Sequence, residues 1–142
     1  MATQATEMPV AVPALAPERA VKWPKRTRAQ LANGLQVVLA EAHSIPKFHG
    51  ELFFRGGEAL ISDRSTGLAE ITATVVRTGT GKRTSRQIEE DLRRLGADLG
   101  TAAGQDTSAI SFAGLSEFSE PLLQLVSELS REASFPEPEL DR

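Results

Sequence analysis

The sequence contains no cysteine, and this absence removes whole classes of chemistry. Without thiols the chain forms no disulfide framework and offers no thiolate nucleophile. It also cannot hold zinc or an iron–sulfur cluster through sulfur. The absence leaves the cellular compartment open, because a cysteine-free chain suits both the cytosol and the periplasm.

Long apolar runs and an excess of positive charge are missing as well. No apolar stretch approaches the roughly 18 residues that a membrane-spanning helix needs. Lys and Arg number 16 against 19 Asp and Glu, so the formal net charge is −3. We therefore expect no membrane span and no nucleic-acid partner. What is present is a chain of 142 residues with an ordinary globular composition, enough for one domain or part of one.

The first part of the chain, residues 1–26, is rich in proline and alanine and shows no apolar period. We interpret it as an extended arm, followed by a domain over residues 27–142. The arm ends in a basic cluster around Trp23, formed by Lys22, Lys25, Arg26 and Arg28. A solvated linker is the expected role of this cluster, with contact to an anionic partner as the alternative.

Alternation and turn residues predict strands. Arg28–Ala32 and Leu35–Glu41 flank Asn33-Gly34, the pair most typical of a tight hairpin. A third strand is expected over about Phe48–Arg55, where apolar and polar positions alternate before Gly56-Gly57. Two more strands, about Ala97–Ala103 and Thr107–Gly114, are expected to form a hairpin.

Capping residues and apolar stripes predict three helices. The first covers about Gly67–Arg77 and is entered after Ser65 or Thr66, either of which can cap it. The second starts at Thr84, three residues before Gln87 as in a capping box, and ends at Gly96. The third begins near Ser119 and presents Phe118, Leu122, Leu125 and Leu129 as a stripe. This order of elements favours an α+β fold whose antiparallel or mixed sheet is covered on one face by helices.

Two familiar kinds of site are rejected on their spacing. Gly79-Thr80-Gly81-Lys82 lacks the first glycine and the final Ser or Thr of a phosphate-binding loop, and it follows a helix. The two histidines, His43 and His49, are six residues apart in a loop and a strand, which is not the spacing of a helical zinc pair. We therefore expect surface histidines, with metal ligation as the less favoured alternative.

The segment from Gly67 to Thr80 resembles the signature helix of the pitrilysin/insulinase family of zinc peptidases, which includes the mitochondrial processing peptidases. That signature is G-x-A-H-x-x-E-H-M-x-x-x-G-T, and Gly67, Ala69, Gly79 and Thr80 are in register with it. Four other segments match the family in its order: Leu31–Leu39, Phe54–Glu58, Leu95–Ala97 and Phe135–Glu137. The resemblance implies a mitochondrial processing peptidase-like metallohydrolase fold over about Arg28–Arg142. It also implies that the chain ends inside a domain, because the family's unit continues beyond Leu140-Asp141-Arg142.

The three chemically active positions of the motif are changed. Glu70 stands at the first zinc ligand, Ala73 at the general base and Thr74 at the second ligand. Ala73 has no group that accepts a proton, and a threonine hydroxyl is a poor neutral ligand. We therefore expect no bound metal, no cofactor and no peptide cleavage by this chain alone, although the family consists of zinc metalloendopeptidases.

The resemblance implies a noncatalytic subunit or half that pairs with a zinc-bearing homologue and helps to hold peptide substrate. Its substrate-binding strand corresponds to Asp98, Leu99, Gly100, Thr101, Ala102 and Ala103. The alternative is a structural core or scaffold subunit of a larger complex, and a zinc peptidase with shifted ligands is less favoured. We also expect the chain to self-associate through an uncovered edge or helix face. A periplasmic or other exported bacterial location is favoured over the cytoplasm.

Overall fold

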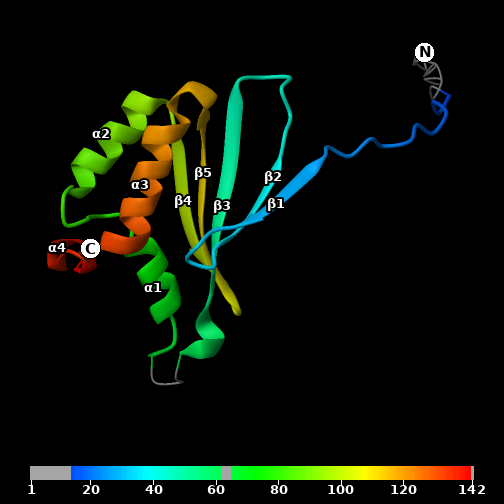
Figure 1. Cartoon of the computed structure of the whole chain (residues 1–142). Helices are drawn as coiled ribbons and strands as arrows, with labels where there is room; N and C mark the ends of the chain where they lie inside the picture. Colours follow the sequence, from blue (N-terminus) through cyan, green and yellow to red (C-terminus); the bar gives the residue numbers. More distant parts are fainter. Residues whose placement is uncertain (1–13, 62–64, 142) are drawn as a thin grey trace, which may run out of the picture. The chain divides into compact units, whose positions relative to one another are not determined.

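The structure is a computed structural model and describes residues 14–61 and 65–141. The chain forms two compact units that divide between Ala42 and His43, and each is described by itself (Figure 1). Residues 14–25 carry no helix or strand and are exposed, while residues 1–13 of the expected arm lie outside the described residues.

The first unit contains an antiparallel hairpin of β1 (Arg26–Gln30) and β2 (Gln36–Ala40). The pairing is as expected, but the predicted two-residue turn at Asn33-Gly34 is wrong. Leu31 and Leu35 belong to the loop, and the Leu31 amide donates to the Leu35 carbonyl at 2.9 Å. The tight turn needs positive φ at both central residues, whereas Gly34 alone adopts it, at φ 88°. The Asn33 side chain instead accepts a hydrogen bond from the Leu35 amide at 3.1 Å.

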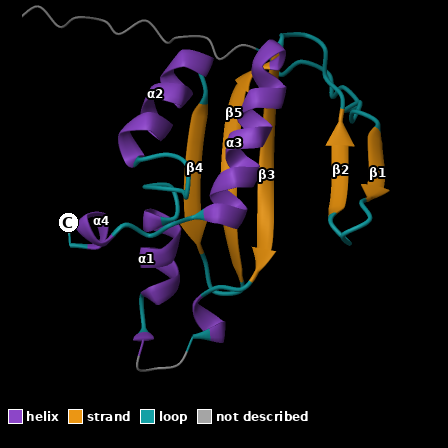
Figure 2. Cartoon of the chain, turned by 60° about the vertical axis from the view of Figure 1, so that its left-hand side comes forward, coloured by secondary structure: helices purple, strands orange, loops and turns teal. Residues whose placement is uncertain are grey.

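The second unit is built on a three-stranded antiparallel sheet. Its strands β3 (Lys47–Arg55), β4 (Asp98–Ala103) and β5 (Thr107–Leu115) lie in the order β3-β5-β4. Helices lie on one face of this sheet (Figure 2). The predicted α+β class with a helix-covered antiparallel sheet is therefore confirmed.

The helices of this unit are α1 (Leu68–Val75), α2 (Ser85–Leu95), α3 (Ser119–Glu132) and the short α4 (Glu137–Leu140). The predicted capping box of α2 is present, because Thr84 and Gln87 bond each other's backbone amides. Gly96 ends α2 in the left-handed conformation at φ 56°, also as predicted. Within the described residues, no helix combines the length and apolar character that crossing a membrane requires.

The core lies between the sheet and the helices α2 and α3. Its members share near-complete burial: Ile88, Leu92, Leu99, Ile110, Phe112, Leu122, Leu125, Val126 and Leu129. Gly50 of β3 pairs with Phe112, whose ring lies where a side chain at position 50 would begin. The glycine thus leaves room for the aromatic ring, and a larger residue there would displace it.

Candidate functional site

Helix α1 carries the three altered motif positions, and a contact from outside the helix fixes its start. Helix α1 begins at Leu68, and its N-cap residue is Gly67, whose φ of 88° is left-handed and which has no side chain to cap the helix. The prediction of a cap by Ser65 or Thr66 is therefore wrong. The Gly67 amide instead donates to the carboxylate of Glu58, in the short 3-10 helix Glu58–Leu60. A carboxylate at this place also suits the positive end of the helix dipole.

The segment Glu58–Leu60 is itself anchored on the loop between β4 and β5. The Glu58 amide donates to the Gly104 carbonyl at 3.0 Å, and the Ala59 amide donates to the Gln105 carbonyl at 2.9 Å. A side chain at Gly57 would collide with this loop, so only glycine permits so close an approach. The start of α1 is therefore positioned by the end of the sheet rather than by its own sequence.

The motif residues themselves do not form a metal site. Glu70 and Thr74 are exposed one turn apart, and Ala73 is half-buried beside them. The Thr74 hydroxyl donates to the Glu70 carbonyl at 2.9 Å, so it satisfies the helix backbone instead of facing a ligand. Within residues 14–61 and 65–141, no three His, Asp or Glu side chains are grouped as metal ligands. The donor set at these positions does not fit zinc, which needs ligands from several directions.

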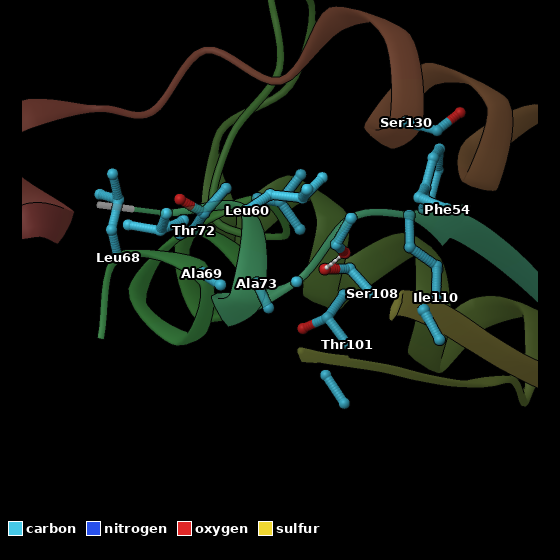
Figure 3. Close-up of a pocket in the computed structure, with 16 residues that line it drawn as sticks. Phe54, Leu60, Leu68, Ala69, Thr72, Ala73, Thr101, Ser108, Ile110 and Ser130 are labelled. Atoms are coloured by element: carbon cyan, nitrogen blue, oxygen red, sulfur yellow. Dashed lines mark hydrogen bonds between the residues drawn. The ribbon is translucent and has the colours of Figure 1, made fainter. Parts of the chain in front are cut away.

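An apolar cavity of about 380 Å³ lies beside the inner face of α1. Ala69, Thr72 and Ala73 form its wall on the α1 side, and Leu60 lies near Thr72 (Figure 3). The sheet supplies the opposite wall and α3 contributes Ser130; the sheet residues are Phe54, Thr101, Ala102, Ser108, Ala109 and Ile110. Ala73, at the position of the general base, thus faces a cavity whose lining is mostly apolar and, among the residues that the structure describes, contributes no carboxylate.

Two of the six residues expected to bind substrate line this cavity, namely Thr101 and Ala102. Leu99 belongs to the core, and Asp98 is exposed at the start of β4. Strand β4 pairs with β5 along one side, and no strand within the described part of the chain pairs along its other side. The structure therefore places the cavity next to a free sheet edge, the arrangement that accepts an added strand.

A polar cluster holds the loop between α1 and α2 against α3. Buried Thr80 donates to the Glu128 carboxylate at 2.5 Å, Arg83 pairs with the same carboxylate, and Arg83 Nε lies 3.0 Å from Asp91 Oδ2. Burial acts to raise the pKa of Glu128. The hydrogen bonds from Thr80 and Arg83, with the charge of Arg83, outweigh it and lower that pKa.

The sequence marks Thr80 only as part of the rejected phosphate loop and as a match to the family signature. In the structure, Thr80 connects the loop to α3 through its hydrogen bond to Glu128.

The sequence does not predict the roles of two further residues, Glu58 and Arg77. Arg77 contacts a β4 carbonyl and Glu89 of α2. No local pattern predicts the contact of Glu58 with Gly67 or that of Arg77 with Leu99, because the partners lie 9 and 22 residues apart in the chain.

No family model matches the chain. It is 23% identical over 118 residues to the "Cytochrome b-c1 complex subunit 1, mitochondrial" of Caenorhabditis elegans, covering 83% of this chain and 25% of that protein. Among solved structures, it is similar to the peptidase M16 inactive domain from Pseudomonas fluorescens, with a TM-score of 0.76 and 28% identity. That likeness covers 82% of this chain and 29% of the other.

Two solved proteases share the fold. The first is a protease from Helicobacter pylori, with a TM-score of 0.74, 18% identity and coverage of 82% of this chain and 28% of that one. The second is the periplasmic protease PqqL from Escherichia coli, with a TM-score of 0.72, 22% identity and coverage of 85% and 14%. The chain thus spans less than a third of each of these four proteins.

Proposed function

Because the chain belongs to the pitrilysin/insulinase-type peptidase family, with a degenerate zinc motif, we propose that it serves as the noncatalytic half of such a peptidase. In this role it pairs with a zinc-bearing homologue and helps to enclose and hold an extended peptide. The observation that carries the proposal is Ala73, which lines an apolar cavity at the position of the general base. A site of this kind can position a peptide and exclude water, but it cannot activate a water molecule.

The free edge of β4 is the proposed place of contact with the peptide. An extended peptide gains main-chain hydrogen bonds by adding to such an edge, and pockets beside the edge select its side chains. Here Thr101 and Ala102 belong both to the strand and to the cavity wall. A side chain of the added peptide that points toward α1 would enter an apolar space, so we propose a preference for aliphatic side chains at that position.

Reconstitution tests the proposal. The full chain is purified alone and together with a homologue from the same organism that keeps an intact H-x-x-E-H motif. We expect hydrolysis of a fluorogenic peptide by the pair, none by this chain, and loss of the pair's activity on chelation. Chelator-sensitive hydrolysis by this chain alone would overturn the noncatalytic assignment.

A structural core subunit is the second candidate, favoured by the similarity to a cytochrome b-c1 complex subunit. The same reconstitution separates the two functions. A stable complex that neither binds nor cleaves the peptide supports the core subunit, whereas cleavage supports the peptidase half. The fold alone does not distinguish them.

An exported bacterial location accompanies the proposed peptidase role. PqqL, one of the proteins of similar fold, is itself described as periplasmic. Fractionation of the source cell with an antibody against this chain tests the location, and recovery from the cytosolic fraction would contradict it.

A further inference from the structure

The free edge of β4 has a defined set of outward-facing backbone groups. The Gly104 amide donates to the Thr107 carbonyl at 2.8 Å, which closes the β4–β5 hairpin. In an antiparallel pair, alternate residues point their N–H and C=O groups toward the partner strand. Gly104 is hydrogen-bonded to β5, so the alternation places the backbone N–H and C=O groups of Ala102 and Gly100 toward β5 as well. Leu99, Thr101 and Ala103 therefore direct their backbone groups toward the free edge.

One of these outward groups is occupied. The Arg77 guanidinium donates through Nη1 to the Leu99 carbonyl at 3.4 Å. Its Nη2 lies 2.9 Å from Glu89 Oε1 in α2, so both terminal nitrogens of the guanidinium have a hydrogen-bond acceptor. The bond to Leu99 is long, and the ion pair with Glu89 keeps the guanidinium in place. A strand added at this edge would have to donate one of its own N–H groups to the Leu99 carbonyl, at the place that the Arg77 guanidinium occupies.

We propose that Arg77 marks the end of the strand-addition site and sets the register of the added peptide. A peptide at this edge hydrogen-bonds to Thr101 and Ala103, beside the cavity, and not to Leu99. This inference rests on the proposed function, because it specifies how the same edge receives its peptide. A charged side chain across part of an edge is also a known protection against uncontrolled strand pairing.

Residue-resolved amide exchange, followed by NMR on the full chain, tests the register. The probe is a synthetic peptide of alternating Thr and Leu residues with Lys at both ends. With the unsubstituted chain, we expect the peptide to slow exchange at Thr101 and Ala103 and to leave Leu99 unchanged. With Arg77→Ala, we expect slowed exchange to extend to Leu99 and affinity to rise roughly fivefold, as one further backbone hydrogen bond provides.

Two further variants keep the test decisive. Glu89→Gln removes the ion pair that holds Arg77 but keeps the arginine. It should extend slowed exchange to Leu99 to a smaller extent than Arg77→Ala. It also provides the test if Arg77→Ala folds poorly. Arg86→Ala removes an arginine of α2 that pairs with Glu90 on the exposed surface, and it should leave the exchange pattern unchanged.

The outcomes separate the two proposals. Protection of Leu99 in the unsubstituted chain would overturn the role of Arg77 while leaving strand addition intact. Absence of protection at all three amides, in every variant, would overturn strand addition and this inference with it. Loss of protection at Thr101 in Arg77→Ala would show that Arg77 supports the edge rather than ends it, which also contradicts the proposal.

Discussion

Helices α1 and α2 follow each other in the chain, yet they are stabilised in different ways. Helix α2 has a capping box at Thr84, a left-handed Gly96 at its end, and the buried residues Ile88 and Leu92. Helix α1 lacks a side-chain cap of its own and exposes Leu68 and Ile71 by 48% and 53%. The comparison shows that α2 is encoded locally, whereas α1 depends on neighbouring segments.

The largest expected effect comes from the buried face of α2. Ile88→Ala removes a side chain that is 1% exposed within the core and should lower the free energy of unfolding by about 2–5 kcal/mol. The matched change on α1, Ile71→Ala, removes the same atoms from a residue that is 53% exposed and should cost less than about 0.5 kcal/mol. Urea unfolding of both variants measures the difference. Equal losses would contradict the contrast between the helices.

The next effect concerns the start of α1. Glu58→Ala removes the carboxylate that accepts from the Gly67 amide, and we expect a loss of about 1–2 kcal/mol. Amide exchange in α1 should accelerate while exchange in α2 stays slow. The control is Glu51→Ala, which removes an exposed carboxylate from β3. If Glu58→Ala were as mild as this control, α1 would not depend on the contact.

A smaller effect is expected at the local cap of α2. Thr84→Ala should lower the free energy of unfolding by about 1 kcal/mol, because the Gln87 amide loses its acceptor. Ser65→Ala provides the comparison, since the sequence predicts Ser65 as a cap for α1 but the N-cap residue of the helix is Gly67. We expect no measurable change for Ser65→Ala by thermal unfolding. A loss similar to that of Thr84→Ala would restore the original prediction for α1.

The smallest effect is a pH dependence at the loop that joins the two helices. The pKa of Glu128 is lowered in the folded chain from its ordinary value of 4.5. Its contribution to stability is therefore present above the unfolded pKa, and it is lost as the pH falls through the folded pKa. Unfolding in urea between pH 7 and pH 3 should show this loss, with Glu128→Gln less dependent on pH than the unsubstituted chain. Identical pH profiles would contradict the assignment to Glu128.

The structure confirms the predictions for the two ends of α2, which depend on neighbouring residues in the sequence. The α2 cap at Thr84 and its end at Gly96 both follow from local patterns. The prediction of a two-residue turn at Asn33-Gly34 is wrong. The Asn33 side chain accepts a hydrogen bond from the Leu35 amide in a longer loop, and the dipeptide alone does not reveal this conformation.

The contacts that build the candidate site could not be predicted, because their partners are distant in the chain. Glu58 reaches Gly67 across the intervening segment, and Arg77 reaches β4 only once α1 lies beside that strand. The cavity likewise forms from three strands, two α-helices and the 3-10 helix Glu58–Leu60, which only the fold brings together. By contrast, the resemblance to the peptidase family identifies the altered motif positions Glu70, Ala73 and Thr74 from the sequence, because these positions lie in one short segment of the chain.

The most direct test of the noncatalytic assignment is a zinc titration by calorimetry. The unsubstituted chain is compared with a double variant, Glu70→His with Thr74→His, in which imidazoles occupy both ligand positions one helical turn apart. We predict no heat of binding for the unsubstituted chain and weak binding for the variant. Tight, stoichiometric zinc binding by the unsubstituted chain would contradict the account and require ligands that converge elsewhere.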